Sequence, residues 1–524
     1  MSIPSATSVH TPPPPFKVDG RVIALTVMIM LATIMQALDT TIANVALPHM
    51  QGSMNAAQDQ ITWVLTSYVV TAAIFNSLTG FLVVRFGRTR IFLISITGFT
   101  IASMLCGAAQ SLEQIVIFRM LQGAMGAMLV PLSQAVLMDV YPKEKHGAAM
   151  AVWGMGVMVG PILGPTIGGY LTEYYSWRWV FYVNLPFGIL AALGVWWLLP
   201  ETKRQPNVRF DLLGFALLSV AVGSLQMMLD RGTTLDWFSS MEIIVEASLA
   251  VLTFYMFVAH MFTARAPFLS PQPFRDRNYA LGLVLSFIMG IALFATMALL
   301  PGLLQGLLGY PVMTTGLILM PRGIGTLFAM ALVGKLVRTV DARWLIMLGF
   351  GLTAVSMHQM AGFSLNVNIR DLVTSGMLQG FGIGLIFVPL TTIAFATLDN
   401  EFRTESAALF ALVRSIGSAF GISGVATMLH ENTQTSHADL VEHITPFSRP
   451  LQALAVDGIW TLQGGERGLA SIAGEINRQA AMVAYVSVFQ IMAYMVVAAM
   501  PIVLLLQPIK KSAMPRKIEM AVEA

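Results

Sequence analysis

Fourteen apolar runs of about 20 residues follow one another along the 524-residue chain, and they constrain its fold more than any other feature. A helix of about 20 apolar residues spans the hydrocarbon core of a bilayer and satisfies its own backbone hydrogen bonds there. Only 11% of the residues are charged, too few to cover a soluble protein of this length. The sequence therefore predicts an all-α integral membrane protein with fourteen transmembrane helices. The runs lie near 22–47, 60–82, 91–110, 113–138, 147–171, 179–199, 211–230, 241–263, 279–302, 312–334, 344–362, 372–395, 405–429 and 482–506.

The positive residues are distributed unequally between the two sides that alternate after each span. With the N-terminus taken as cytoplasmic, 21 Lys and Arg residues fall on the cytoplasmic side, six on the other side and three inside spans. This asymmetry follows the positive-inside rule. We therefore expect a multi-pass protein of the bacterial inner membrane whose tails, 1–21 and 508–524, are both cytoplasmic.

Several classes of function lack the residues that they require. Cys106 is the one cysteine, which excludes a disulfide framework and a Cys-based metal site. No GxxxxGK[ST] phosphate loop occurs, so nucleotide-driven transport is disfavoured. The eight histidines are scattered, and no cluster of His, Asp or Glu favours an integral-membrane enzyme. We expect no metal, no cofactor and no nucleic-acid partner.

An internal repeat divides the chain into two halves. The fourth span contains LQGAMGAMLVPLS (121–133), and the twelfth contains LQGFGIGLIFVPLT (378–391), 257 residues later. The segments GFLVV (80–84) and GKLVR (334–338) recur at nearly the same offset. Parallel six-helix repeats around a central cavity make a major-facilitator fold. The predicted parts are a six-helix bundle at 22–200, two inserted helices at 201–264, helices 9 to 13 at 265–429, a periplasmic loop at 430–481 and the fourteenth helix at 482–507.

Asp39 and Arg119 are charged residues inside predicted spans. A charge at that depth costs roughly 2.5–3.5 kcal/mol on insertion scales, so a functional role is the default hypothesis. If the first span ends at Pro48, the two side chains lie at similar depths and can meet. We interpret Asp39 as a proton-coupling carboxylate with Arg119 as its partner. A purely structural hydrogen bond is the alternative.

Arg322 and Arg414 lie near the middle of their spans, and no Asp or Glu is expected inside helices 9 to 14. Such an arginine must use backbone carbonyls, water, Gln379 or a visiting anion. We hypothesise a substrate cavity, lined also by Gln36, that favours lipophilic weak acids over cations. Packing without a substrate role is the alternative. Whether Glu246 joins a proton route stays open.

Two stretches are interpreted as gating elements. Glycines at a four-residue spacing in the fifth span let another backbone approach closely, and the prolines that follow two of them add a bend. We interpret this helix as part of the seam along which the halves gate, and the arginines after the second span as a latch. Tight helix packing and topology anchoring alone are the alternatives. The residues are Gly156, Gly160, Pro161, Gly164, Pro165, Gly168, Gly80, Arg85, Gly87 and Arg88.

Several motifs together resemble one family over nearly the whole chain. They are ALDTTIANVALP in the first span, RMLQGAMGA in the fourth, GPILGPTIGG in the fifth and SWRWVFYVNLPFG at 176–188. With the fourteen spans, they resemble the drug:proton antiporter branch of the major facilitators. Within that branch, the segments 223–232, 235–243 and 430–447 are similar to EmrB-like multidrug exporters.

The resemblance implies proton-driven multidrug efflux of amphipathic toxic compounds, with Asp39 and Arg119 as coupling residues. It also implies a tripartite pump with a periplasmic adaptor (membrane fusion protein) and an outer-membrane channel, for which 430–480 is the expected docking surface. Val84 stands where the family commonly has an acidic residue, which weakens the expected latch. The alternative is proton-coupled transport of a specific metabolite or siderophore, and the Gly/Pro stripe of the fifth span counts against it.

Overall fold

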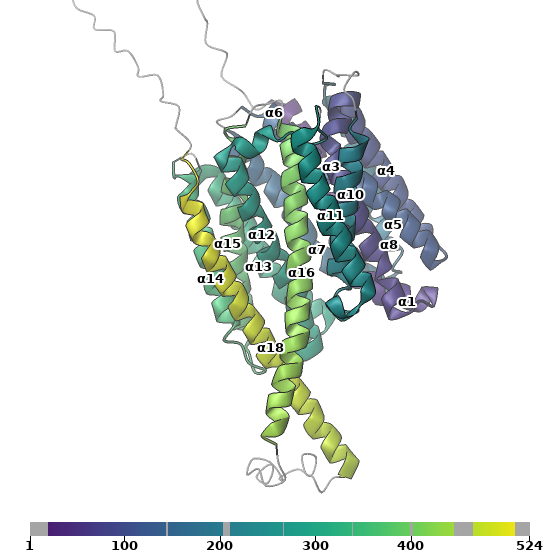
Figure 1. The fold of residues 1–524 in the computed structure, drawn as a ribbon, viewed down its shortest axis with the longest axis vertical. Coiled ribbons are helices and arrows are strands. Elements are labelled where there is room, and N and C mark those ends of the chain that lie inside the picture. Colours follow the sequence, from purple (N-terminus) through teal and green to yellow (C-terminus); the bar gives the residue numbers. More distant parts are fainter. Residues whose placement is uncertain are drawn as a thin grey trace, which may run out of the picture.

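A computed structural model describes residues 19–142, 145–202, 210–265, 267–337, 339–398, 402–444 and 465–508, and these contain helices and no strand (Figure 1). Within these ranges, thirteen helices are long and apolar enough to cross a membrane. The remaining predicted span corresponds to α14 (Ala342–Met360), which packs between α15 and α18. The all-α membrane fold predicted from the apolar runs is therefore confirmed.

The N-terminal half consists of α1 to α9. Its elements are α1 (Gly20–Met54), α2 (Gln58–Ile61), α3 (Trp63–Phe86), α4 (Arg88–Ala108), α5 (Leu112–Gly126), α6 (Leu129–Val140), α7 (His146–Tyr174), α8 (Trp179–Tyr182) and α9 (Asn184–Leu198). Two of the spans are broken by proline. Pro131 and Pro186 have no N–H for the carbonyls one turn earlier, and the chain divides there into α5 and α6 and into α8 and α9.

The C-terminal half follows an inserted helix pair. The pair is α10 (Leu212–Arg231) and α11 (Met241–Thr263), joined through η2 (Trp237–Ser239). The half itself contains η3 (Gln272–Arg275), α12 (Arg277–Pro301), η4 (Gly302–Leu307), α13 (Val312–Leu336), α14, α15 (Ile369–Phe395), α16 (Arg403–Glu442) and α18 (Gly465–Leu504). Both described chain ends lie on one face of the bundle, at the top of Figure 1, which we call the terminal face.

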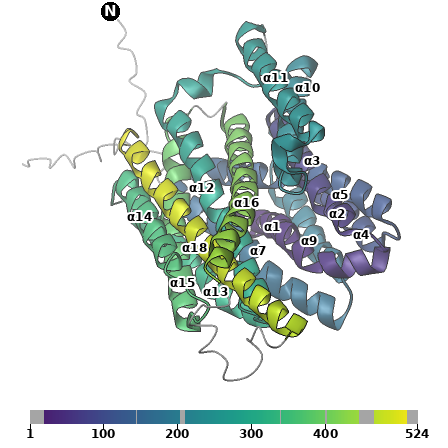
Figure 2. The ribbon, with the colours of Figure 1, turned by 60° about the horizontal axis from the view of Figure 1, so that its bottom comes forward.

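The packing of one half repeats in the other. In the first half α1 packs against α7 and α9, and α5 packs against α3 and α4. In the second, α12 packs against α16 and α18, and α15 packs against α13 and α14. The halves meet where α7 contacts α13 and where α3 contacts α16. Helices α10 and α11 lie at the edge of the bundle, where α10 packs against α3 and α16 (Figure 2).

The outward surface of the inserted pair is apolar. Val251 and Tyr255 of α11 are 72% and 71% exposed in the isolated chain. Its other face, with Ile243, Ala250 and Phe257, is buried. Exposed apolar side chains in this pattern are those of a helix that has lipid on one side and protein on the other.

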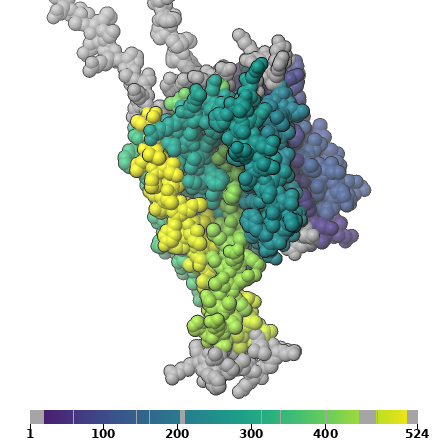
Figure 3. All heavy atoms as spheres, in the orientation of Figure 1, coloured from purple at the N-terminus to yellow at the C-terminus, as the bar shows by residue number. Residues whose placement is uncertain are grey.

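Two boundaries predicted from the sequence are wrong. The first helix does not end at Pro48 but continues to Met54, because one missing N–H leaves the rest of the helical hydrogen bonds in place. The predicted loop at 430–481 is helical at both of its ends: α16 runs on to Glu442 and α18 already begins at Gly465. These extensions project from the bundle opposite the terminal face (Figure 3). Residues 445–464 and most of both predicted tails lie outside the described ranges.

Candidate functional site

Asp39 stands at the centre of a buried hydrogen-bond network in the N-terminal half. Its Oδ2 accepts from Arg119 Nη1 at 2.7 Å. Its Oδ1 accepts from Gln122 Nε2 at 2.7 Å and from Asn184 Nδ2 at 2.9 Å. Because all three partners donate, the arrangement fits an ionised carboxylate. The expected contact between Asp39 and Arg119 is therefore present.

Four spans supply this network. Asp39 lies on α1, Arg119 and Gln122 on α5, and Asn184 on the first turn of α9. Asn184 also donates to Ser103 Oγ on α4, which in turn donates to the Phe181 carbonyl. These side chains are at most 1% exposed. The carboxylate thus binds directly to two other helices of its own half, α5 and α9, and through Asn184 it is linked to a third, α4.

The guanidinium of Arg119 is held on several sides. Besides its bond to Asp39, its Nη1 donates to Gln122 Oε1 at 2.8 Å, and its Nε donates to the Val64 carbonyl at 3.1 Å. Its centre lies 4.2 Å from the centroid of the Tyr68 ring. A cation over a desolvated aromatic face is stabilised by about 2 kcal/mol. Arg119 is therefore held in this conformation by neutral groups as well as by the charge of Asp39.

Protonation of Asp39 would change the net charge of this buried network. With Asp39 ionised, the buried pair is neutral; with Asp39 protonated, Arg119 carries an uncompensated charge. Removing one partner of a buried ion pair costs about 3–5 kcal/mol. A proton on Asp39 therefore changes the relative stability of any two conformations that solvate Arg119 differently.

Sequence reasoning missed three members of this network. Gln122 and Asn184 lie in the motifs RMLQGAMGA and SWRWVFYVNLPFG, but the sequence does not indicate that either side chain contacts Asp39. Ser103 carried no signal, because a serine inside a span is common. Glu246 is buried on α11, and no hydrogen bond of the Asp39 network involves it.

The glycines of α7 pack against α1, the helix that carries Asp39. A Cβ on Gly160 would lie 2.2 Å from the Ala37 carbonyl carbon, and one on Gly164 would lie 2.1 Å from Thr41 Oγ1. Thr41 Oγ1 also donates to the Gly160 carbonyl at 3.0 Å. The two backbones are in direct contact on both sides of the turn that holds Asp39.

The helix α7 does lie at the seam, because it contacts α13 of the other half, but its glycine stripe faces α1 of the same half. Gly156 and Gly168 also face α1, at Met30 and Ile42. Pro165 is half-buried, and the side chain of Pro161 lies outside the described part. The stripe determines how α1 is held and not how the halves meet.

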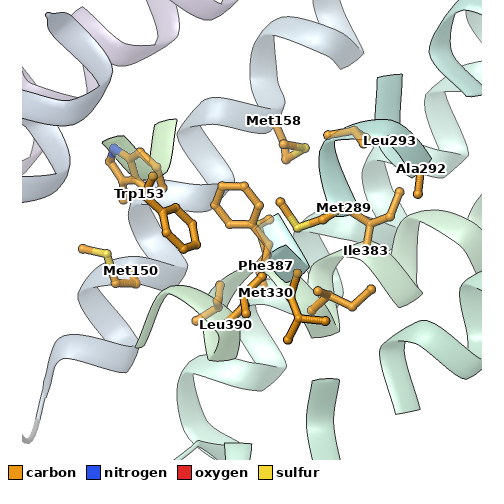
Figure 4. Packing of buried hydrophobic residues seen from close by; sticks show 14 of the residues in the cluster. Met150, Trp153, Met158, Met289, Ala292, Leu293, Met330, Ile383, Phe387 and Leu390 are labelled. Atoms are coloured by element: carbon orange, nitrogen blue, oxygen red, sulfur yellow. The ribbon is translucent and has the colours of Figure 1, made fainter. Parts of the chain in front are cut away.

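Aromatic side chains meet at the seam, where α7 of one half contacts α15 of the other. Trp153 of α7 stacks on Phe387 of α15, with ring centroids 5.6 Å apart (Figure 4). Figure 4 also shows Met158 of α7 facing Met289 of α12. In this conformation apolar side chains fill the space between the halves at that level.

The four residues predicted to line one cavity are distributed over separate places. Gln36 donates to Tyr68 Oη at 3.3 Å, beside the Asp39 network. Arg414 lies 5.4 Å from the Phe387 ring centroid, at the seam, and its Nη1 is buried with no hydrogen-bond partner in the described residues. Arg322 and Gln379 lie within the C-terminal half, where Arg322 Nη2 donates to the Leu293 carbonyl.

The expectation that helices 9 to 14 hold no acidic residue is wrong near the helix ends, including the projecting ends of α16 and α18. Asp371 and Glu405 lie in the first turns of α15 and α16, which begin earlier than the apolar runs suggest. Neither forms an ion pair with Arg322 or Arg414 in the described residues. The middle of this half still places two arginines without an acidic partner.

Charged groups join the two halves at the terminal face. Arg88, the first residue of α4, forms an ion pair with Asp139 at the end of α6. Asp139 also lies 3.5 Å from Arg403, the first residue of α16 in the other half. Asp139, 51 residues after Arg88 in the sequence, thus provides the carboxylate that was expected at the position of Val84. The sequence spacing does not indicate this ion pair.

The turn that presents these arginines depends on two glycines. Gly87 has φ +94°, a conformation that favours glycine, and it separates α3 from α4. A Cβ on Gly80 would lie 3.1 Å from the Glu405 backbone, so α3 and α16 are in close contact there. Arg85 lies 5.8 Å from the Phe81 ring and takes no part in the Asp139 ion pairs.

Comparison with known proteins identifies the family. Residues 29–422 match the model of the Major Facilitator Superfamily. The chain belongs to the major facilitator superfamily. This membership makes it a transporter rather than a membrane enzyme. Within the described residues, moreover, no group of His, Cys, Asp and Glu is arranged to hold a metal ion.

Curated relatives match this major facilitator along most of its length. It is 36% identical over 502 residues to the fatty acid resistance protein FarB of Neisseria gonorrhoeae, a match that covers 94% of this chain and 98% of that protein. It is 35% identical over 474 residues to the multidrug export protein EmrB of Escherichia coli K12, covering 90% and 92%. The human organic anion transporter MFSD10 superposes with a TM-score of 0.58 at 14% identity, over 91% of this chain and 100% of that one, and supports the fold alone.

Gly160→Ala is expected to destabilise the protein by forcing α1 away from α7. The added Cβ would meet the Ala37 backbone, which cannot rotate away, and overpacking of this kind costs about 1–3 kcal/mol. The measurement is the thermal unfolding temperature of the purified protein in detergent. Gly474→Ala on α18 is the matched control, because nothing lies within 4 Å of its Cβ. An unfolding temperature of Gly160→Ala equal to that of the wild type would contradict the packing argument.

Proposed function

We propose that this major facilitator is a proton-driven multidrug exporter that carries amphipathic compounds, with lipophilic weak acids favoured, across the bacterial inner membrane. The observation that carries the proposal is the Asp39–Arg119 pair, a titratable ion pair that is fully buried inside a transporter. The full-length similarity to EmrB and FarB supports export of toxic compounds as the use of that pair.

In this proposal the terminal face is cytoplasmic, because 21 of the 30 Lys and Arg residues are assigned to that side by the order of the spans. A proton that enters from the periplasm binds Asp39 and leaves Arg119 uncompensated. The resulting loss of stability favours the conformation in which the Arg119 network opens. Release of the proton to the cytoplasm restores the neutral pair and resets the transporter.

The α1–α7 contact transmits this change. Since Gly160 and Gly164 clamp the backbone of α1 next to Asp39, a shift of α1 on protonation carries α7 with it. The opposite face of α7 contacts the other half, where Gly154 faces Met330. The ion pairs of Asp139 with Arg88 and Arg403 hold the cytoplasmic ends together until this movement separates them.

The preference for acids follows from the charges at the seam. Arg414 lies beside Phe387 at the seam, and its Nη1 is buried without a hydrogen-bond partner in the described residues. No carboxylate in the described residues forms an ion pair with it. An anionic compound supplies the missing charge, whereas a cation adds to it. Apolar neighbours such as Phe387 contact the rest of an amphipathic molecule.

The test of coupling uses purified protein in liposomes with an imposed pH gradient and a lipophilic acid as substrate. Asp39→Asn is expected to abolish gradient-driven accumulation, because the side chain no longer binds and releases a proton. Exchange of labelled for unlabelled substrate across the same membrane needs no net proton movement and should persist. Accumulation that survives Asp39→Asn would refute the proposed role. Glu113→Gln, an exposed acid in the first turn of α5, is the control and should accumulate normally.

The projecting ends of α16 and α18 are proposed as the docking surface for a periplasmic adaptor that leads to an outer-membrane channel. Residues 430–442 add about 20 Å of helix beyond the predicted span, at about 1.5 Å per residue. Their side chains are mostly exposed and include Glu431, Asp439 and Glu442, which suit water and protein rather than lipid.

Replacement of 431–479 by a short Gly/Ser linker tests this docking surface. Gradient-driven transport in liposomes should persist, because the Asp39 network lies elsewhere. Resistance of intact Gram-negative cells to the exported acid should fall to that of cells without the transporter, at equal amounts of membrane-inserted protein. Full resistance in those cells would show that the projection is not needed for assembly.

A further inference from the structure

The hydrogen bond between Gln122 and Asp39 has a counterpart in the C-terminal half. Gln379 Nε2 donates to Thr296 Oγ1 at 2.9 Å, as Gln122 Nε2 donates to Asp39 Oδ1 at 2.7 Å. Each residue of the second pair lies 257 positions after its counterpart, the offset that relates the repeated segments. All four side chains are fully buried. The two halves thus contain the same site, with a threonine in the second where the first has its carboxylate.

The arginine of this second site comes from a different helix. Gly376 takes the position of Arg119, and Arg322 takes that of Tyr68 at the 254-residue offset between the second and tenth spans. In the N-terminal half those two residues are stacked on each other. A Cβ on Gly376 would lie 3.8 Å from Arg322 Cβ, so Arg322 lies next to the position on α15 that corresponds to Arg119. The second site keeps a guanidinium and lacks the acid.

Two polar groups of this site have lost the partners that their counterparts have. Gln379 Oε1 is buried and accepts no hydrogen bond in the described part of the chain, whereas Gln122 Oε1 accepts from Arg119. Arg322 is 9% exposed, and its one hydrogen bond there goes to the Leu293 carbonyl, which brings no negative charge. A buried guanidinium without an acidic partner and a buried amide oxygen without a hydrogen bond mark a place where a carboxylate can bind.

We propose that Arg322, Thr296 and Gln379 form a binding site for the carboxylate of an aliphatic acid, in the place that corresponds to Asp39 in the other half. The ligand carboxylate pairs with the Arg322 guanidinium and accepts the second N–H of Gln379 Nε2. Arg322, drawn toward the carboxylate, then reaches Gln379 Oε1, as Arg119 reaches Gln122. The aliphatic chain extends along Leu293 toward the apolar side chains of the seam in Figure 4.

The assignment deepens the proposed function, on which its biological use rests, by naming the substrate class and the groups that recognise it. It also explains why the same construction serves two purposes. In one half the carboxylate belongs to the protein and binds a proton. In the other half the carboxylate is brought by the ligand.

The test places a carboxylate at Thr296, the position that corresponds to Asp39. Wild type, Thr296→Asp, Thr296→Asn and Arg322→Gln are purified in detergent, and equilibrium binding of radiolabelled decanoate is measured at neutral pH, with decanamide as the uncharged competitor. Thr296→Asp should weaken decanoate binding by about tenfold or more, because its own carboxylate takes the place of the ligand's next to Arg322. Thr296→Asn, of similar size and no charge, should bind close to wild type, and Arg322→Gln should bind as weakly as Thr296→Asp.

Wild-type affinity in Thr296→Asp, or competition by decanamide as effective as that by decanoate, would overturn the proposal. If Thr296→Asp does not elute as a monodisperse protein, the comparison of Thr296→Asn with Arg322→Gln decides, and equal affinities overturn the site. Binding in detergent needs no gradient. Loss of gradient-driven transport with this binding pattern intact therefore counts against the proposed function alone, and intact transport without the pattern counts against the site alone.

Discussion

The ion pair between Asp39 and Arg119 is the interaction on which the rest of the structure depends. Both groups are dry, and each is held by neutral partners in addition to the other charge. A buried pair of this kind contributes little net stability compared with apolar packing, but breaking it by removing one charge costs about 3–5 kcal/mol. In the proposed mechanism a proton on Asp39 removes that charge, and a cost of this size is enough to select between two conformations.

The two halves share a construction and differ in charge. The repeat gives each half a glutamine that binds the facing helix, through Gln122 in one and Gln379 in the other. Only the first half retains an acid at the contact, so only that half can bind a proton there. The second half keeps an arginine without an acid. In the proposed mechanism, this one difference between the repeated halves assigns proton binding to the first and anion binding to the second.

The sequence predicts the charged part of the site better than its neutral part. Asp39 and Arg119 were found because a charge inside an apolar run is rare, and their contact holds although α1 continues past Pro48. Asn184 is 145 residues from Asp39 in the sequence, and nothing in the sequence indicates that its neutral side chain contacts the carboxylate. Thr296 has no signal of its own.

For the fold as a whole, the sequence predicts the apolar spans well and the polar helix ends poorly. Hydropathy located the spans, since apolar runs of that length have few other uses. It did not show the ends of α16 and α18, because 430–442 and 465–480 are helical but rich in polar residues. The glycine spacing in α7 was interpreted as part of the seam between the halves, whereas these glycines face α1. A stripe of small residues shows that a backbone comes close, and the sequence does not say which one.

A double-mutant cycle on the central ion pair tests this account most directly. Thermal unfolding of wild type, Asp39→Asn, Arg119→Gln and the double variant is compared in one detergent at neutral pH. Each single variant leaves a buried charge or its hydrogen bonds without a partner, so each should lower the unfolding temperature. The double variant should be more stable than the sum of the two losses predicts, with a coupling of about 2 kcal/mol or more. Losses that simply add would show that the two charges do not depend on each other, which would contradict the account.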